Sequence, residues 1–222
     1  LSAYIPVCNA MLDLGPVWLD KYIRTYLAEG IANGLEKAII DGSGKNEPVG
    51  MLRNIKGASD PDTGYPAKEK KAITSFDPAN YGKIVAEFTK VQGRTRRIGE
   101  LFMVVNSQDY YDKVMPSTTL MTPNGSYVND VFPIKTEVIT SAYVPEGTAV
   151  LGIKGGYFMG IGMDRGGKIE KSEHVRFLDD NTVYKIKLYG MGKPKLNENF
   201  IALDISGLKP LRYVVAEEPP AA

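Results

Sequence analysis

Apolar residues at three- and four-residue steps run from Leu19 to Ile39, and this pattern constrains the fold more than any other. The spacing is that of one face of an α-helix, and Gly42 after Asp41 provides a C-terminal stop. About twenty-five residues at about 1.5 Å each make a rod roughly 37 Å long. The positions that share the face are Leu19, Tyr22, Ile23, Tyr26, Leu27, Gly30, Ile31, Gly34, Leu35, Ala38 and Ile39. The sequence therefore predicts a long helix that other segments lie across.

Two glycines inside this helix indicate a close neighbour. Gly30 and Gly34 each cost about 1 kcal/mol relative to alanine in a helix interior. Such a cost is tolerable where another segment packs closely against the helix. We therefore expect a strand laid over the helix at these two positions.

The remaining segments predict helices early in the chain and strands later. Pro6 makes the opening segment extended, because proline restricts the residue before it. After a short helical turn at residues 10–12 and the long helix, 41–72 form a loop rich in Gly and Pro. Further helices are expected from Asp77 to about Val91 and from Asn106. The expected strands are 101–105, 149–153, 157–163, 182–189 and 200–205.

Strand 182–189 shows the clearest alternation, with Thr182, Tyr184, Ile186 and Leu188 on one face. Because the helices come first and antiparallel-looking strands follow, the order of elements predicts an α+β fold.

The charge balance argues against a protein that binds nucleic acid over a wide face. The chain has 27 Lys and Arg against 26 Asp and Glu, a formal net charge of +1. A protein that grips nucleic acid over a wide face shows a basic excess, because phosphate neutralisation supplies much of the affinity. The densest basic run is Lys90, Arg94, Arg96 and Arg97. We interpret it as a solvated or subunit-contacting surface, with nucleic-acid contact as the less favoured alternative.

Single copies of two reactive residue types limit the cofactor chemistry. Cys8 is the one cysteine, which leaves no partner for an internal disulfide and fits a reducing compartment. With His174 as the one histidine, four Cys or His ligands for zinc are not available. There is no apolar run near eighteen residues, so we expect no membrane-spanning helix. No secretory leader is visible, and the start at Leu1 suggests a processed or truncated product.

Glycine-rich segments invite nucleotide-binding interpretations that fail on spacing. In Gly42-Ser43-Gly44-Lys45, a P-loop needs glycine where Ile39 stands and Ser or Thr where Asn46 stands. The run Gly152–Gly162 lacks the strand-to-helix context of a dinucleotide loop, since the turn Met163–Gly167 follows it. Strands that use glycine to let neighbouring segments approach closely explain these glycines better.

The other polar candidates do not form a catalytic pattern. His174 has no matched nucleophile, and the acidic pairs Asp60/Asp62 and Asp179/Asp180 lie where turns are expected. No serine lies in a G-x-S-x-G elbow. We therefore expect no enzyme, and name no catalytic, cofactor-binding or metal-ligating residue.

Motifs in the first fifty residues, taken in order, carry a family resemblance. They are Tyr4-Ile5-Pro6-Val7, Ala10-Met11-Leu12-Asp13, Leu19-Asp20-x-Tyr22-Ile23, Leu27-Ala28, Leu35-Glu36-x-Ala38, Asp41-Gly42-Ser43-Gly44 and Pro48-Val49-Gly50-Met51. Later parts are similar too: 101–106, 149–153 and 175–181. The chain resembles the tailed-bacteriophage major capsid family, whose type is the Hong Kong 97 capsid protein.

The resemblance implies a Hong Kong 97-type fold with a long spine helix and two interleaved domains. The peripheral domain would take 1–52 and 154–189, and the axial domain 53–153 and 190–222. It further implies that the late strands cross the spine helix at Gly30 and Gly34. The family implies self-assembly into pentamers and hexamers of an icosahedral virion capsid, built in the bacterial host cytoplasm. Scaffold, maturation protease and portal are implied partners, and the packaged DNA is enclosed without sequence-specific binding.

Two departures from the family pattern stand out. The family has an N-terminal arm and an extended loop before the Ile-Pro segment, and this sequence begins almost at that segment, as an N-terminally truncated member would. Some relatives form lysine–asparagine crosslinks assisted by a glutamate. Asn181 resembles the asparagine position, but Leu188 stands where the glutamate is expected. We predict no crosslinking.

Two rival functions remain open. An encapsulin-type shell shares the fold and encloses a protein cargo in place of DNA. A small-molecule-binding enzyme would use the strands of Gly152–Gly167.

Overall fold

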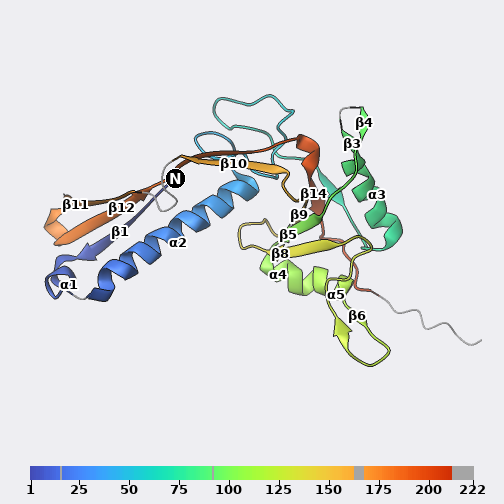
Figure 1. The fold of residues 1–222 in the computed structure, drawn as a ribbon, viewed down its shortest axis with the longest axis horizontal. Coiled ribbons are helices and arrows are strands. Elements are labelled where there is room, and N and C mark those ends of the chain that lie inside the picture. The colour runs from blue at the N-terminus through green and yellow to red at the C-terminus, as the bar shows by residue number, and fades with distance from the viewer. Residues whose placement is uncertain (16, 92, 163–167, 212–222) are drawn as a thin grey trace, which may run out of the picture. The chain divides into compact units, whose positions relative to one another are not determined.

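A computed structural model of the chain describes residues 1–15, 17–91, 93–162 and 168–211 (Figure 1). These residues pack as two compact units. Unit 1 consists of Leu1–Ala67 and Tyr157–Asn197, and unit 2 of Lys68–Gly156 and the residues from Glu198 on. Both units are therefore assembled from segments that are far apart in the sequence.

The predicted long helix is the main element of unit 1. It is α2, Val17–Asp41, and it has 25 residues. The short helix α1 (Asn9–Asp13) precedes it, and β1 (Ser2–Cys8) opens the chain. The buried face of α2 follows the predicted period and packs with residues of β1 and the late strands. The cluster comprises Val7, Leu19, Ile23, Leu27, Ile31, Ile186 and Leu188.

A three-stranded antiparallel sheet in the order β1-β12-β11 accompanies α2 (Figure 1). Its late members are β11 (Lys168–Arg176) and β12 (Asn181–Lys187), joined through the 3₁₀ turn Phe177–Asp179. The predicted strand 182–189 is divided, because β12 ends at Lys187 and β13 (Tyr189–Pro194) begins after Leu188. The predicted shared face is confirmed, because Thr182, Ile186 and Leu188 are buried and Tyr184 is half-buried.

A strand does pack over the helical glycines, but it is not one of the late strands. A Cβ at Gly30 would lie 3.3 Å from the Cβ of Ala3, and one at Gly34 would lie 3.5 Å from Cδ2 of Leu1. Among the described residues, no other side chain comes within 4 Å of a Cβ at either glycine. The expectation that strands of 154–189 cross there is therefore wrong. The chain's own first residues occupy the place, because β1 is the strand that β12 holds against α2.

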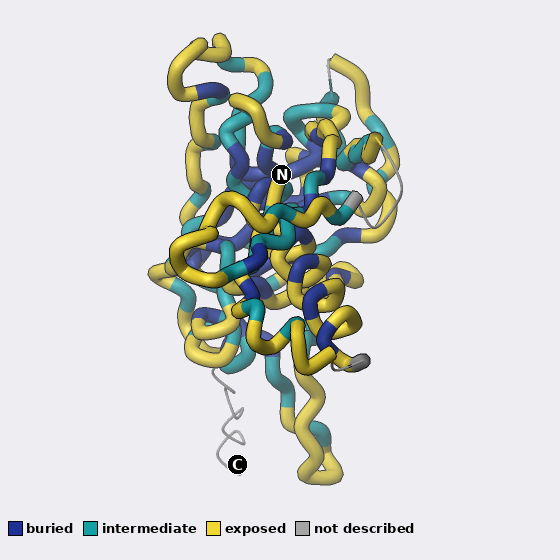
Figure 2. The backbone as a smooth tube through the Cα atoms, turned by 90° about the vertical axis from the view of Figure 1, so that its left-hand side faces the viewer, coloured by how far each residue is buried: buried dark blue, intermediate teal, exposed yellow. Residues whose placement is uncertain are grey.

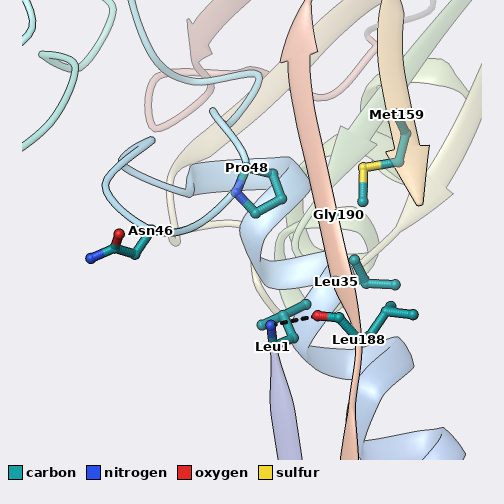
Figure 3. Close-up of a pocket in the computed structure, with 7 residues that line it drawn as sticks. All are labelled: Leu1, Leu35, Asn46, Pro48, Met159, Leu188 and Gly190. Carbon is teal, nitrogen blue, oxygen red and sulfur yellow. Dashed lines mark hydrogen bonds between the residues drawn. The ribbon is translucent and has the colours of Figure 1, made fainter. Parts of the chain in front are cut away.

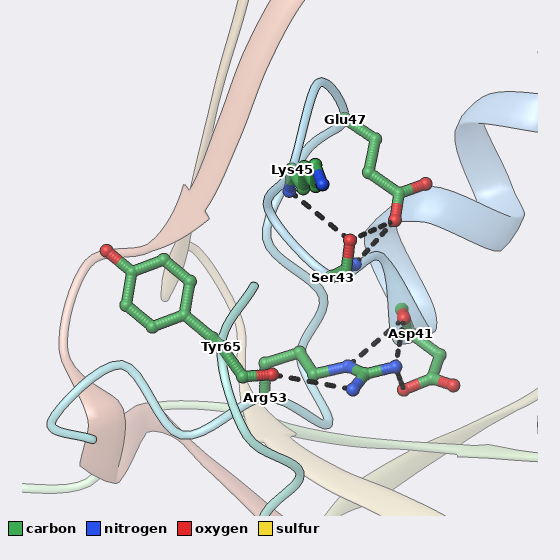
Figure 4. Close-up of polar contacts among 6 residues, drawn as sticks. All are labelled: Asp41, Ser43, Lys45, Glu47, Arg53 and Tyr65. Atoms are coloured by element: carbon green, nitrogen blue, oxygen red, sulfur yellow. Dashed lines mark hydrogen bonds and ion pairs between the residues drawn. The ribbon is translucent and has the colours of Figure 1, made fainter. Parts of the chain in front are cut away.

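The predicted loop of 41–72 is irregular until β2 (Lys70–Ala72), yet it is well tied (Figure 4). Arg53 donates from Nη2 to the carbonyl of Asp41 at 2.9 Å and forms an ion pair with its carboxylate at 3.0 Å. Ser43 donates through both its N–H and its hydroxyl to Glu47. Val49 N–H donates to the carbonyl of Gly192, which joins the loop to the ribbon of β10 (Tyr157–Gly162) and β13.

Unit 2 is built on a five-stranded sheet in the order β2-β14-β9-β5-β8. Its further strands are β5 (Leu101–Val105), β8 (Thr136–Thr140), β9 (Thr148–Ile153) and β14 (Phe200–Asp204). The expectation of antiparallel strands holds for β9 with its two neighbours. It is wrong for β5/β8 and β14/β2, which are parallel. The helical segment between β5 and β8 explains the first case, because parallel neighbours need a long crossover connection.

Helix α3 (Pro78–Thr89) covers this sheet with one apolar face. Asp77 caps it by accepting from the N–H of Asn80, and proline occupies its first turn, where a missing N–H is harmless. Tyr81, Ile84, Val85 and Phe88 are buried. Tyr81 Oη lies 2.6 Å from Thr136 Oγ1, and burial raises the pKa of Tyr81 to about 12.

A helical run and two short hairpins complete unit 2. The run consists of α4 (Ser107–Asp109), a π-helical turn (Tyr110–Val114) and α5 (Met115–Thr118). One hairpin pairs β3 (Lys90–Val91) with β4 (Arg94–Thr95), and the other pairs β6 (Leu120–Met121) with β7 (Tyr127–Val128). A 3₁₀ turn, Asn197–Asn199, leads into β14.

Candidate assembly surfaces

The polar candidates of the sequence are held in local turns. Asp60 accepts from the N–H groups of Asp62 and Thr63, and these two hydrogen bonds lower the pKa of the Asp60 carboxyl. Asp180 has a left-handed backbone (φ 52°) and accepts from the side-chain amide of Asn9 at 2.8 Å. His174 is exposed on β11. Over the described ranges, no three Asp, Glu, His or Cys residues are grouped to hold a metal ion.

The Gly42–Lys45 segment is a helix stop followed by a tight turn (Figure 4). Gly44 has φ +86°, and a Cβ there would lie 2.8 Å from Cγ2 of Val49. A left-handed backbone and a close neighbour both favour glycine at this position. The glycines therefore serve the turn.

The described part of the other glycine-rich segment adjoins a hollow too small for a metabolite (Figure 3). Met159 of β10 lines it together with Leu1, Leu35, Asn46, Pro48, Leu188 and Gly190. The hollow measures about 20 Å³, which is close to the room that one water needs. The predicted turn Met163–Gly167 lies outside the described residues.

An aromatic stripe lies on the exposed side of α2. Trp18, Tyr22 and Tyr26 follow at four-residue steps, and each is about half exposed. Their ring centroids are 6.1 and 5.5 Å apart, so the three rings form one contiguous surface. A hollow of about 280 Å³ lies beside Tyr26, between α2 and β1, and Tyr4 and Ile5 help to line it. Unit 1 thus leaves a sizeable apolar surface open on its spine helix.

A second exposed apolar surface of unit 1 is the turn between β11 and β12. Val175, Phe177 and Leu178 point into solvent there, and Leu178 is 97% exposed. We call these three residues the apolar tip. The tip is held in shape because the N–H of Asn9 donates to the carbonyl of Asp180. The described residues of unit 1 leave this tip exposed.

Unit 2 carries a third exposed apolar surface on the hairpin of β6 and β7, which extends from the unit (Figure 1). Met121, Tyr127 and Val128 are exposed, Tyr127 at 71%. We call these residues and their two strands the apolar hairpin. Figure 2 shows it at the bottom of the view, exposed along most of its length.

The basic run divides into one half-buried, internally bonded arginine, Arg96, and three exposed charges. Arg96 donates from Nε to the carbonyl of Phe88 at 2.8 Å, from Nη1 to Oδ1 of Asn199 at 2.7 Å, and from Nη2 to the carbonyl of Glu198. Arg96 is therefore partly exposed, but its guanidinium is bonded within unit 2, which the interpretation of the run as a surface did not include. Lys90, Arg94 and Arg97 are exposed. No sequence pattern marks Arg96 apart from its neighbours, because two of its three partners, Asn199 and Glu198, lie about a hundred residues away.

The structure resembles solved capsid shells at low sequence identity. It matches the capsid of an empty GTA particle with a TM-score of 0.61 at 14% identity, covering 92% of this chain and 72% of that chain. The SrpI encapsulin of Synechococcus elongatus matches with 0.58 at 14% identity, covering 96% and 76%. Gordonia phage Cozz matches with 0.57 at 11% identity, covering 95% and 70%. These likenesses show the fold.

The sequence itself gives the family. A profile of the phage capsid family matches residues 1–111, half of the chain. The chain belongs to the phage capsid family. No protein with a curated functional description matches it.

Membership in the phage capsid family confirms the resemblance, the α+β class and the Hong Kong 97-type fold. The chain is a capsid shell subunit, a structural protein of a virion capsid. The described helices include none of the length and apolar character needed to cross a membrane.

The residues linked to crosslinking in the family take ordinary structural places here. Asn181 opens β12 opposite Cys8 of β1. Leu188 is buried, and its backbone exchanges two hydrogen bonds with Leu1 (Figure 3). Because the glutamate position holds a packed leucine, the absence of crosslinking stays our prediction.

Proposed function

We propose that this shell subunit assembles through rings of five and six copies into an icosahedral head that encloses phage DNA. The observation that carries the proposal is the grouping of exposed apolar side chains into the aromatic stripe, the apolar tip and the apolar hairpin. Single exposed apolar residues are normal on any protein. Contiguous groups mark interaction surfaces.

The three surfaces differ from one another, which favours head-to-tail contact. An interface between unlike surfaces closes into a ring when its rotation is right. We assign unit 1 to the peripheral domain and unit 2 to the axial domain, so that unit 2 with its apolar hairpin faces the ring axis. Scaffold, maturation protease and portal would be the assembly partners, in the bacterial cytoplasm, and no enzymatic step is needed of this chain.

Electron microscopy with sedimentation velocity tests assembly. The protein is expressed from Leu1 and also with whatever residues its coding sequence places before Leu1. We expect rings or closed shells, and substitution of Phe177 and Leu178 by serine should abolish them. Lys37→Ser, at an exposed position of α2, is the matched control. Small uniform particles at every concentration and salt, in both versions, would contradict the proposal.

An encapsulin-type shell is the second candidate, favoured by the likeness to SrpI. Shells purified from the native host distinguish the two. Nuclease-resistant DNA inside supports the phage head, whereas a stoichiometric protein cargo found by mass spectrometry supports the encapsulin.

A further inference from the structure

Positive charge is concentrated in one short segment of a nearly neutral chain. Residues 83–97 hold five cationic side chains, Lys83, Lys90, Arg94, Arg96 and Arg97, and one acidic side chain, Glu87. The whole chain has a net charge of only +1. The segment covers the second half of α3 and the hairpin of β3 and β4.

The structure neutralises few of these charges. Glu87 pairs with Lys71 from β2, so it is not available to its cationic neighbours. Arg96 is used internally by the carbonyls of Phe88 and Glu198 and by Asn199. Within the described residues, Lys90, Arg94 and Arg97 form no ion pair, and all three are exposed. We call these three residues the basic hairpin cluster.

The Arg96 clamp holds this cluster on a fixed support. The N–H of Arg96 donates to the carbonyl of Thr89, which continues the ladder of β3 and β4 to the end of α3. Lys90 lies opposite Thr95, and Val91 lies opposite Arg94. Because neighbouring strand positions point to opposite faces, Lys90 and Arg94 present charge on both faces of the hairpin. A support that is already ordered loses little conformational freedom on binding.

The surface around the cluster indicates the kind of partner. None of the described residues between Phe88 and Leu101 is a large exposed hydrophobic side chain. Protein interfaces draw their affinity from buried aromatic and apolar anchors, and the hairpin offers none. Nucleic-acid interfaces are more polar and strongly positive. Arginine suits phosphate in particular, because its planar fork can donate two parallel hydrogen bonds to one phosphate group.

We propose that Lys90, Arg94 and Arg97 form a sequence-independent contact for the phosphate groups of nucleic acid. The contact does not depend on ring or shell formation, since it lies on a single copy of unit 2. It is also compatible with the net charge, because the hairpin is a local contact and not a wide binding face.

Salt-dependent binding to a short DNA duplex, followed by fluorescence anisotropy, tests the proposal. Each phosphate contact adds about 0.9 to the slope of log K against log salt concentration. The triple variant K90S/R94S/R97S should therefore lower the slope by about 2 to 3 between about 50 and 200 mM salt, and should weaken binding at least about tenfold at the low end. Circular dichroism checks that the variant is folded.

The control variant K37S/K193S/K195S removes the same charge from exposed positions of unit 1. It should keep most of the slope. Equal loss in both variants, or an unchanged slope in K90S/R94S/R97S, would overturn the proposal. So would tighter binding of poly-glutamate than of DNA by the unsubstituted chain, lost in the same triple variant, because it would assign the cluster to an acidic protein segment. Assembly is measured separately, so either result leaves the shell test unaffected.

Discussion

Two hairpins of unit 2 have the same backbone plan and opposite surface chemistry. The strands of each are two residues long, and each turn contains a glycine with positive φ, Gly93 in one and Gly125 in the other. The β3–β4 hairpin is basic and clamped through Arg96 to Phe88 and Asn199. The apolar hairpin exposes Met121, Tyr127 and Val128.

The same two-stranded backbone therefore supports either kind of surface, and the side chains alone decide what each hairpin contacts. A pair of strands this short is not stable alone, so each hairpin depends on the unit that supports it. The basic hairpin is fixed by the buried end of α3, and the apolar hairpin at its base by the N–H of Val131, which donates to the carbonyl of Thr118 in α5. A shell subunit can thereby use one hairpin for apolar contacts with protein and the other for contacts with negatively charged groups.

The largest expected effect concerns the support of the basic hairpin. Phe88 is fully buried at the end of α3. Phe88→Ala should destabilise unit 2 by about 3 to 5 kcal/mol, the usual result of deleting a buried aromatic ring. Urea unfolding followed by circular dichroism measures this. Val128→Ala on the apolar hairpin is the control and should stay within about 0.5 kcal/mol. Equal losses would show that the two hairpins are supported alike.

The second effect isolates the clamp. Arg96→Ala removes three hydrogen bonds and leaves Asn199 Oδ1 without this donor, so we expect a loss of about 2 to 3 kcal/mol. Arg94→Ala, two residues away and exposed, should change the unfolding free energy by less than about 0.5 kcal/mol. If the two variants unfold at the same urea concentration, Arg96 is not a clamp.

The third effect concerns the apolar hairpin and association. Replacing Met121 and Tyr127 by serine should weaken self-association about tenfold or more, since buried aromatic anchors at interfaces commonly contribute above about 1 kcal/mol. Sedimentation velocity over a concentration series measures it. The stability of the isolated chain should not change, and Lys90→Ser should leave association as it was. Unchanged association would remove the apolar hairpin from the interface.

The smallest expected effect is on stability when the exposed charges of the basic hairpin are removed. K90S/R94S/R97S should leave the unfolding free energy within about 0.5 kcal/mol of the unsubstituted chain, because exposed charges without partners contribute little to stability. Thermal unfolding at low and high salt checks this. A clear stabilisation at low salt alone would reveal repulsion among the three charges in the free chain.

Local periodicity predicted much of the fold. The buried positions Leu19, Ile23, Leu27 and Ile31 of α2, the alternation around Ile186 and the start of α3 depend on neighbours a few residues away, and they appear where the pattern placed them. The exposed side of α2 was not recognised as a surface, because Tyr22 and Tyr26 fit the same helical period as the core residues.

The pairing of segments that are far apart in the sequence could not be predicted from local periodicity. The parallel pairing of β5 with β8, and the neighbour of Gly30, depend on which segments meet in space. The predicted domain boundaries after residues 52, 153 and 189 fall before those of the compact units, after 67, 156 and 197. The residues between are an irregular loop (53–67), a short turn (154–156) and most of β13, and their local sequence does not assign them to one unit. The peripheral and axial assignments stay a prediction.

The pairing of the first strand with one of the last has a consequence for biosynthesis. Ser2 of β1 faces Lys187 of β12, and β14 enters its sheet between β2 and β9. Neither unit can close until these late residues have left the ribosome. A nascent chain therefore keeps the apolar face of α2 uncovered by β12 throughout most of its translation, when chaperones have access to it. Chains that end before residue 181 lack β12, the strand that holds β1. Incomplete translation products should therefore not fold into subunits that could be incorporated into a shell as defects.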